Sequence, residues 1–140
     1  MKKEVFLILC CILVILLSSC AFDVVHVKQI PTKIDSSHLT KAPFKLEKDV
    51  KVSLGTGYSR KLKKGTRWNY VGTIPYGDVY KTNDQILTVE ASNIYEAYIV
   101  VSSGKLVGFY LPVEHSFFPI NDSKELKMSK INNVILDKRR

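Results

Sequence analysis

The sequence predicts an all-β domain, a small antiparallel barrel or sandwich, behind an apolar N-terminal segment and a linking stretch. Apolar and polar residues alternate with period two from Phe44 to Leu54 and again from Trp68 to Ile74. Such alternation is typical of strands with one buried face. Turn residues rich in glycine separate these stretches at short intervals, and no convincing long helical pattern follows the N-terminal segment.

The N-terminal segment places Lys2 and Lys3 before an unbroken apolar run from Val5 to Leu17. That run is too short for a membrane-spanning helix, which needs about 20 residues, and it suits a signal-peptide core of about 7 to 15 residues. It ends in Leu17-Ser18-Ser19-Cys20, which resembles the lipobox of bacterial lipoproteins. The resemblance implies removal of residues 1–19 and lipid chains on Cys20. An uncleaved anchor and an ordinary signal peptide with an incidental cysteine are the alternatives.

The cysteines restrict the chemistry of the mature chain. Of 3 cysteines, Cys10 and Cys11 would leave with the signal peptide and Cys20 would carry lipid. We therefore expect no disulfide, no thiolate metal site, no cysteine nucleophile and no cofactor. In lipoproteins of this kind an aspartate after the lipidated cysteine resembles an inner-membrane retention signal, and this chain has Ala21 there. The resemblance implies the outer membrane, facing the periplasm, with the inner membrane and the cell surface left open.

The net charge is strongly positive. The full chain has 21 basic and 13 acidic residues; without Lys2, Lys3 and Glu4 these become 19 and 12, a net charge of +7. An exported protein does not meet nucleic acid, so we expect none as a partner. Lipid head groups, lipopolysaccharide phosphates and wall carboxylates are the anions that such a charge attracts. Solvated surface charge without a partner is the alternative.

Residues 20–42 are predicted to form a lipidated tether, residues 43–120 the β-domain and residues 121–140 a C-terminal extension that could pack on the domain. The tether contains Pro31 and several serines and threonines, and its periodicity is weak. Its early part is more apolar, so part of it could instead dock on the domain as an edge strand; the residues concerned are Phe22, Val24, Val25 and Val27.

The first strand is predicted over Phe44 to Leu54, with Lys48 marking a turn or bulge. A glycine turn follows, and the basic stretch from Arg60 to Gly65 is predicted to be a connection. After the strand that ends at Ile74, Pro75 to Asp78 form a turn, because proline pre-sets φ and glycine permits the reversal. Val79-Tyr80 is too short to assign.

The second half contains the most apolar strand. Gln85 to Ala91 is predicted as a strand, and Ile94 to Val101 as a central strand covered on both faces. A hairpin turn at Ser103-Gly104 leads into Lys105 to Leu111, where Gly108 indicates a bulge or a close backbone approach. Beyond Pro119 the pattern allows either a short helix from Lys124, capped by Ser123, or a strand.

Two resemblances follow from these motifs. The glycine-closed loop, the Ser103-Gly104 hairpin and the final strand that ends in proline resemble bacterial SH3-like domains, which implies an SH3-like barrel as an alternative fold. Gly65-Thr66-x-Trp68-x-x-Val71-Gly72-x-Ile74-Pro75-x-Gly77-Asp78-Val79-Tyr80, together with the stretch from Gly108 to Glu114, resembles a family of small Gram-negative envelope lipoproteins. That resemblance covers roughly Lys64 to Pro119 and implies the compartment but no activity.

The candidate contact residues are a basic cluster and nearby tyrosines: Arg60, Lys61, Lys63, Lys64, Tyr58 and Tyr76. Lysine and arginine beside aromatic rings could bind an anion, a sugar or a peptide. Trp68 and Tyr80 lie close by in the sequence, and the alternative is that Trp68 and at least one tyrosine pack in the core.

Catalytic and metal chemistry is not indicated. His26, His38 and His115 have no metal-ligand spacing, and Glu114 beside His115 would point to the opposite face of a strand. We therefore expect no catalytic residues and no metal. The sequence predicts a membrane-anchored, non-enzymatic binding or accessory module that binds an envelope protein or an anionic envelope component. The alternative is an inhibitor, immunity or exclusion lipoprotein that acts against a toxin, phage or lytic enzyme.

Overall fold

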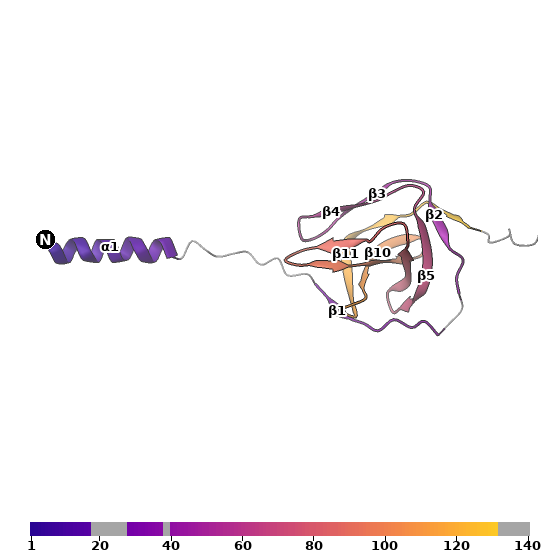
Figure 1. The fold of residues 1–140 in the computed structure, drawn as a ribbon, viewed down its shortest axis with the longest axis horizontal. Helices are drawn as coiled ribbons and strands as arrows, with labels where there is room; N and C mark the ends of the chain where they lie inside the picture. Colours follow the sequence, from indigo (N-terminus) through magenta and orange to yellow (C-terminus); the bar gives the residue numbers. More distant parts are fainter. Residues whose placement is uncertain (18–27, 38–39, 132–140) are drawn as a thin grey trace, which may run out of the picture.

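The computed structural model describes residues 1–17, 28–37 and 40–131 and shows one N-terminal helix apart from a β-domain (Figure 1). Within these residues no helix has both the length and the apolar character that crossing a bilayer requires. Cys20, His26 and His38 lie outside the described residues. The elements are α1 (Lys2–Leu17), β1 (Ile30–Pro31), β2 (Phe44–Leu46), β3 (Val50–Ser53), β4 (Ser59–Leu62), β5 (Arg67–Ile74), β6 (Gly77–Thr82), β7 (Thr88–Glu90), β8 (Ile94–Glu96), β9 (Tyr98–Ser102), β10 (Lys105–Leu111), β11 (Ser116–Glu125) and β12 (Met128–Lys130).

The fold is all-β, as predicted, and every strand pairing in the described residues is antiparallel. Eight strands form one sheet in the order β1-β11-β10-β9-β6-β5-β2-β12, and the hairpins β3–β4 and β7–β8 form two small sheets beside it. In the described chain β1 and β12 have one neighbour each, so the sheet is not a closed barrel. The arrangement is that of a small sandwich.

The predicted central strand is correct in its second half and wrong in its first. Ile99 and Val100 are fully buried in β9, which lies between β6 and β10. Ile94 to Glu96 instead form β8, which pairs with β7 outside the main sheet. The break occurs at Ala97, whose N–H donates to the Leu87 carbonyl (2.9 Å) and so leaves the main ladder.

The other strands also differ in extent from the predictions. The turn or bulge predicted at Lys48 separates β2 from β3. Residues 59–62, predicted as part of a connection, form β4, in which only Leu62 is fully buried. The unassigned Val79-Tyr80 belong to β6, which occupies the middle of the sheet. A strand with a single buried residue, such as β4, or with two adjacent buried residues, such as β6, does not show the period-two alternation from which strands are predicted.

The C-terminal part of the described chain joins the two ends of the sheet. β11 lies second from one end and β12 forms the other end, yet only Leu126 and Lys127 separate them. The N–H of buried Leu126 donates to the Gly104 carbonyl (3.0 Å), and the N–H of Glu47 donates to the Lys127 carbonyl (2.9 Å). The strand alternative after Pro119 is therefore correct, and no helix begins at Lys124.

Apolar side chains cover both faces of the sheet. The larger core cluster contains Trp68, Ile99 and Phe109 and is completed by residues of the two small hairpins. A smaller cluster on the other face includes Val79, Val100 and Phe117, and the N-terminal segment packs on it with Ile30 and Ile34. Part of the predicted tether, residues 28–37, thus lies against the domain. Phe22, Val24, Val25 and Val27, for which docking as an edge strand is the alternative, lie outside the described residues.

Gly72 permits that docking. A Cβ on Gly72 would lie 2.7 Å from the Asp35 carbonyl oxygen and 2.7 Å from a side-chain carbon of Ile34. Asp35 and Thr73 form an isolated antiparallel bridge with two hydrogen bonds of 2.8 Å. The close approach of the two backbones therefore explains why a glycine stands at this position in β5.

Candidate functional site

The aromatic residues proposed as a contact surface divide into two groups. Trp68 and Tyr80 belong to the core, which confirms the packing interpretation for both. The Trp68 indole nitrogen is buried and has no hydrogen-bond partner among the described residues, so it is not offered to a ligand. Tyr58 and Tyr76 are exposed but come from the turns of different hairpins, and Tyr76 stacks on Phe117 at a centroid distance of 4.3 Å.

The basic residues gather on the β3–β4 hairpin. Val50, Val52 and Leu62 point inward and are buried, so the intervening residues face solvent. In this register Lys51 and Lys61 stand directly opposite each other on the outer face. Like charges in that position destabilise a strand pair. Lys51 was not among the predicted contact residues, although the alternation of β3 already placed it outward.

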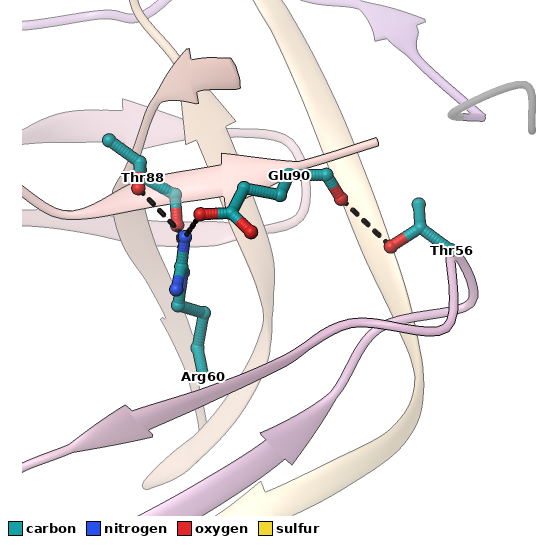
Figure 2. A network of polar contacts seen from close by, with 4 residues as sticks. All are labelled: Thr56, Arg60, Thr88 and Glu90. Carbon is teal, nitrogen blue, oxygen red and sulfur yellow. Dashed lines mark hydrogen bonds and ion pairs between the residues drawn. The ribbon is translucent and has the colours of Figure 1, made fainter. Parts of the chain in front are cut away.

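Arg60 points the other way and fastens the hairpin to β7 (Figure 2). Its Nε donates to the Thr88 carbonyl (2.5 Å), its guanidinium also donates to Thr88 Oγ1 (2.9 Å), and it forms an ion pair with Glu90. Thr56, in the turn of the same hairpin, donates from Oγ1 to the Glu90 carbonyl (2.8 Å). The side chains of Arg60 and Thr56 therefore join the β3–β4 hairpin to β7, and the role of Arg60 in this structure is to connect these two elements.

Asp49 neutralises part of the basic surface. It accepts a hydrogen bond from the Lys64 N–H (2.7 Å) and an ion pair from Lys61 Nζ (2.9 Å). The Lys64 hydrogen bond first, and then the Lys61 hydrogen bond, lower the pKa of Asp49 below its usual range. Lys51 and Lys63 are exposed, and no ion pair to either is seen within the described residues.

Two surface hollows share the loop residues Gln85, Ile86 and Leu87, and one of them lies beside the β3–β4 hairpin. The larger, of about 560 Å³, lies between β3–β4 and the loop and is lined by Lys51, Ser59, Arg60, Lys61, Gln85, Ile86, Leu87 and Thr88. The smaller, of about 360 Å³, includes Lys81, Glu96 and Tyr98 in its lining. Ile86 borders both and is 81% exposed. The arrangement offers cations and one apolar side chain to a ligand.

The remaining polar clusters connect parts of the fold. Lys41 forms an ion pair with Asp78, which accepts a hydrogen bond from Thr73 Oγ1 (3.1 Å). The Asp78 hydrogen bond raises the pKa of Lys41 above its usual value. These contacts fix the segment before β2 to the β5–β6 hairpin.

The predicted surface histidine is exposed. His115 lies in the turn before β11, and its Nδ1 is 3.5 Å from the Tyr110 hydroxyl. Across the described residues no three His, Cys, Asp or Glu side chains gather as a metal site would need.

Comparison with protein-family models, curated proteins and solved structures found no match for this chain. The functional assignment therefore depends on the chemistry of the surface. Of the predicted contact residues, the structure places Lys61 and Arg60 at one hollow, puts Lys63 and Lys64 at the end of the same hairpin, and leaves Tyr76 on another hairpin.

Proposed function

We propose that this protein is a lipid-anchored module of the bacterial envelope that binds an anionic envelope component without catalysis. The lipobox-like Leu17-Ser18-Ser19-Cys20 supports the anchor, with residues 1–19 as signal peptide and Cys20 as the lipidated residue. Ala21 favours the outer membrane, with the domain facing the periplasm. The helix α1 has 16 residues and ends at Leu17, the first residue of this motif. Its apolar run from Val5 to Leu17 has the length of a signal-peptide core rather than of a membrane span.

The observation that carries the binding proposal is the pair Lys51 and Lys61 on the outer face of the β3–β4 hairpin. These lysines face each other across two strands and border the larger hollow. Asp49 already pairs with Lys61, so an anion at this point would relieve the repulsion that remains and would give Lys51 a partner. Lipopolysaccharide phosphates, wall carboxylates and an acidic envelope protein all offer such a charge.

Replacing Cys20 with serine is expected to abolish acylation, since no other cysteine remains after residue 19. The variant should accumulate unprocessed or appear in the soluble fraction. Metabolic labelling with a fatty-acid probe, followed by fractionation of membranes, measures both effects. Equal labelling of the variant and the parent protein would refute the lipid anchor.

Replacing Lys51, Lys61 and Lys63 with glutamine is expected to weaken binding to isolated lipopolysaccharide or cell wall about tenfold at low salt, because a few exposed ionic contacts of up to about 1 kcal/mol act together. Arg60 is kept, because its loss would detach the hairpin from β7. A sedimentation assay over a range of salt concentrations measures the change.

The matched control replaces three exposed lysines elsewhere, Lys105, Lys127 and Lys130, with glutamine. Both triple variants lose the same charge, so only the place of the charge differs between them. Equal weakening by both would mean that net charge alone binds the anion. If neither variant binds more weakly, the proposed contact surface is wrong.

A further inference from the structure

The N-terminal segment reaches the domain early, which limits how far the domain can stand from a lipid on Cys20. Ile30 pairs with Phe117, and Ser116 Oγ donates to Gln29 Oε1 (3.1 Å). Eight residues, Cys20 to Val27, then precede the described segment. At about 3.3 to 3.6 Å per residue, their fully extended length is about 28 Å. That length is about one diameter of a domain of this size.

The end of the domain at which the chain arrives carries the tips of both small hairpins. β1 runs antiparallel to β11, with Ile30 opposite Phe117 and Pro31 opposite Ser116, so the chain enters β1 from the side of the β11 residues that follow Phe117. There a Cβ on Gly55, in the β3–β4 turn, would lie 3.7 Å from the Asn121 amide nitrogen. Thr56 then joins this turn to Glu90, at the end of β7. In Figure 1 the β3–β4 turn lies on the left of the domain.

These tips expose apolar side chains. Ile94, which pairs with Glu90 at the β7–β8 turn, is 72% exposed, and Tyr58 in the β3–β4 turn is 49% exposed. The other end of β11, at Ser116, follows the turn that contains Val113. The N-terminal segment contacts this turn later, at Thr32, whose N–H donates to the His115 carbonyl. Val113 is 71% exposed. Ile94 and Val113 thus lie toward opposite ends of β11 and are nearly equally exposed.

We infer that the end of the domain that carries Tyr58 and Ile94 rests on the surface of the lipid bilayer. The inference depends on the lipid anchor of the proposed function, because only the anchor holds the start of the described segment, Lys28, within about 28 Å of the membrane. Tyrosine suits the membrane–water interface, since its ring enters the apolar layer while the hydroxyl stays hydrated. An isoleucine beside it gains from the same transfer, and the net positive charge of the domain is attracted to anionic head groups.

The test uses the full-length lipidated protein in vesicles of neutral and anionic phospholipids, with and without brominated acyl chains. One variant carries Ile94→Trp and the matched variant carries Val113→Trp; buried Trp68 contributes the same background to both. Brominated lipid is expected to quench most of the added emission of Ile94→Trp and to leave the added emission of Val113→Trp nearly unchanged. In the lipidated protein without substitutions, the amides of residues 54–58 and 91–94 should exchange more slowly when vesicles are present than when they are absent.

Flotation of the protein with vesicles separates the two proposals. If the protein without substitutions does not float with the vesicles, both the lipid anchor and the docking surface are refuted. If it floats but both added tryptophans are quenched equally, or neither is quenched, the anchor stands and the docking surface is refuted. If circular dichroism shows that either variant has lost its fold, the hydrogen exchange of the lipidated protein without substitutions decides. Exchange that vesicles leave unchanged at both hairpin tips would refute the inference.

Discussion

Replacing Ile99 with aspartate is expected to abolish folding of the β-domain. Ile99 is fully buried in β9, where it stands between Tyr80 of β6 and Phe109 of β10. An unpaired carboxylate at this position costs several kcal/mol, against about 5 to 15 kcal/mol for the whole stability of a domain. The loss should appear in circular dichroism as the disappearance of the β signal and of the cooperative thermal transition.

The control for this variant is Ile86→Asp, which makes the same chemical change at a position that is largely exposed. Its melting temperature should stay close to that of the parent protein, because surface substitutions usually change stability by less than about 0.5 kcal/mol. A cooperatively folded Ile99→Asp variant would contradict the position of β9 in the core. A largely helical spectrum of the parent domain would overturn the fold class itself.

Replacing Gly108 with alanine is expected to cause the second-largest loss. The added Cβ would overlap the Phe118 carbonyl oxygen and lie 2.5 Å from a ring carbon of Phe117, so β11 must move away from β10. Overpacking of this kind costs about 1 to 3 kcal/mol. For a domain of about 100 residues, each kcal/mol lowers the melting temperature by about 4 to 8 °C, which thermal unfolding followed by circular dichroism resolves easily.

Gly55→Ala provides the comparison for Gly108→Ala. At Gly55 the nearest atom to an added Cβ is the Asn121 amide nitrogen at 3.7 Å, which is an ordinary contact. This variant is expected to melt within a few degrees of the parent protein. Equal melting temperatures for the two variants would show that the β10–β11 pair accommodates a side chain at residue 108.

The features that the sequence predicts well are those governed by local rules. Gly108 was predicted to mark a bulge, and the register of β10 shifts between Leu106 and Gly108 against both neighbours. The Ser103-Gly104 turn and the burial of Trp68 follow equally from turn chemistry and alternation. Each of these depends on residues close together in the chain, so no knowledge of distant partners is required.

Features that depend on contacts between residues far apart in the chain could not be predicted from the sequence pattern. Arg60 looked like one more member of a basic surface, but it differs from Lys61 because Thr88 and Glu90 come within reach of its guanidinium. Residues 94–101 are divided between two sheets at Ala97, whose N–H donates to the Leu87 carbonyl. The hydrophobic periodicity of the sequence gives no sign of this hydrogen bond. The sequence alone shows that basic residues gather between residues 60 and 64, whereas the direction in which each of them points needed the three-dimensional register.

The pairing of segments that lie far apart in the sequence has a consequence for how the domain folds. Gln29 and Ser116 are 87 positions apart, and β12 completes the far end of the sheet only after β11 has been placed. Contacts of such long sequence separation slow folding, because much chain entropy is lost before they form. A chain that emerges with its N-terminus first therefore cannot finish its sheet until almost all of it has appeared. If the protein is exported as we propose, this delay would keep the polypeptide unfolded during translocation and would leave completion of the sheet to the compartment that it enters.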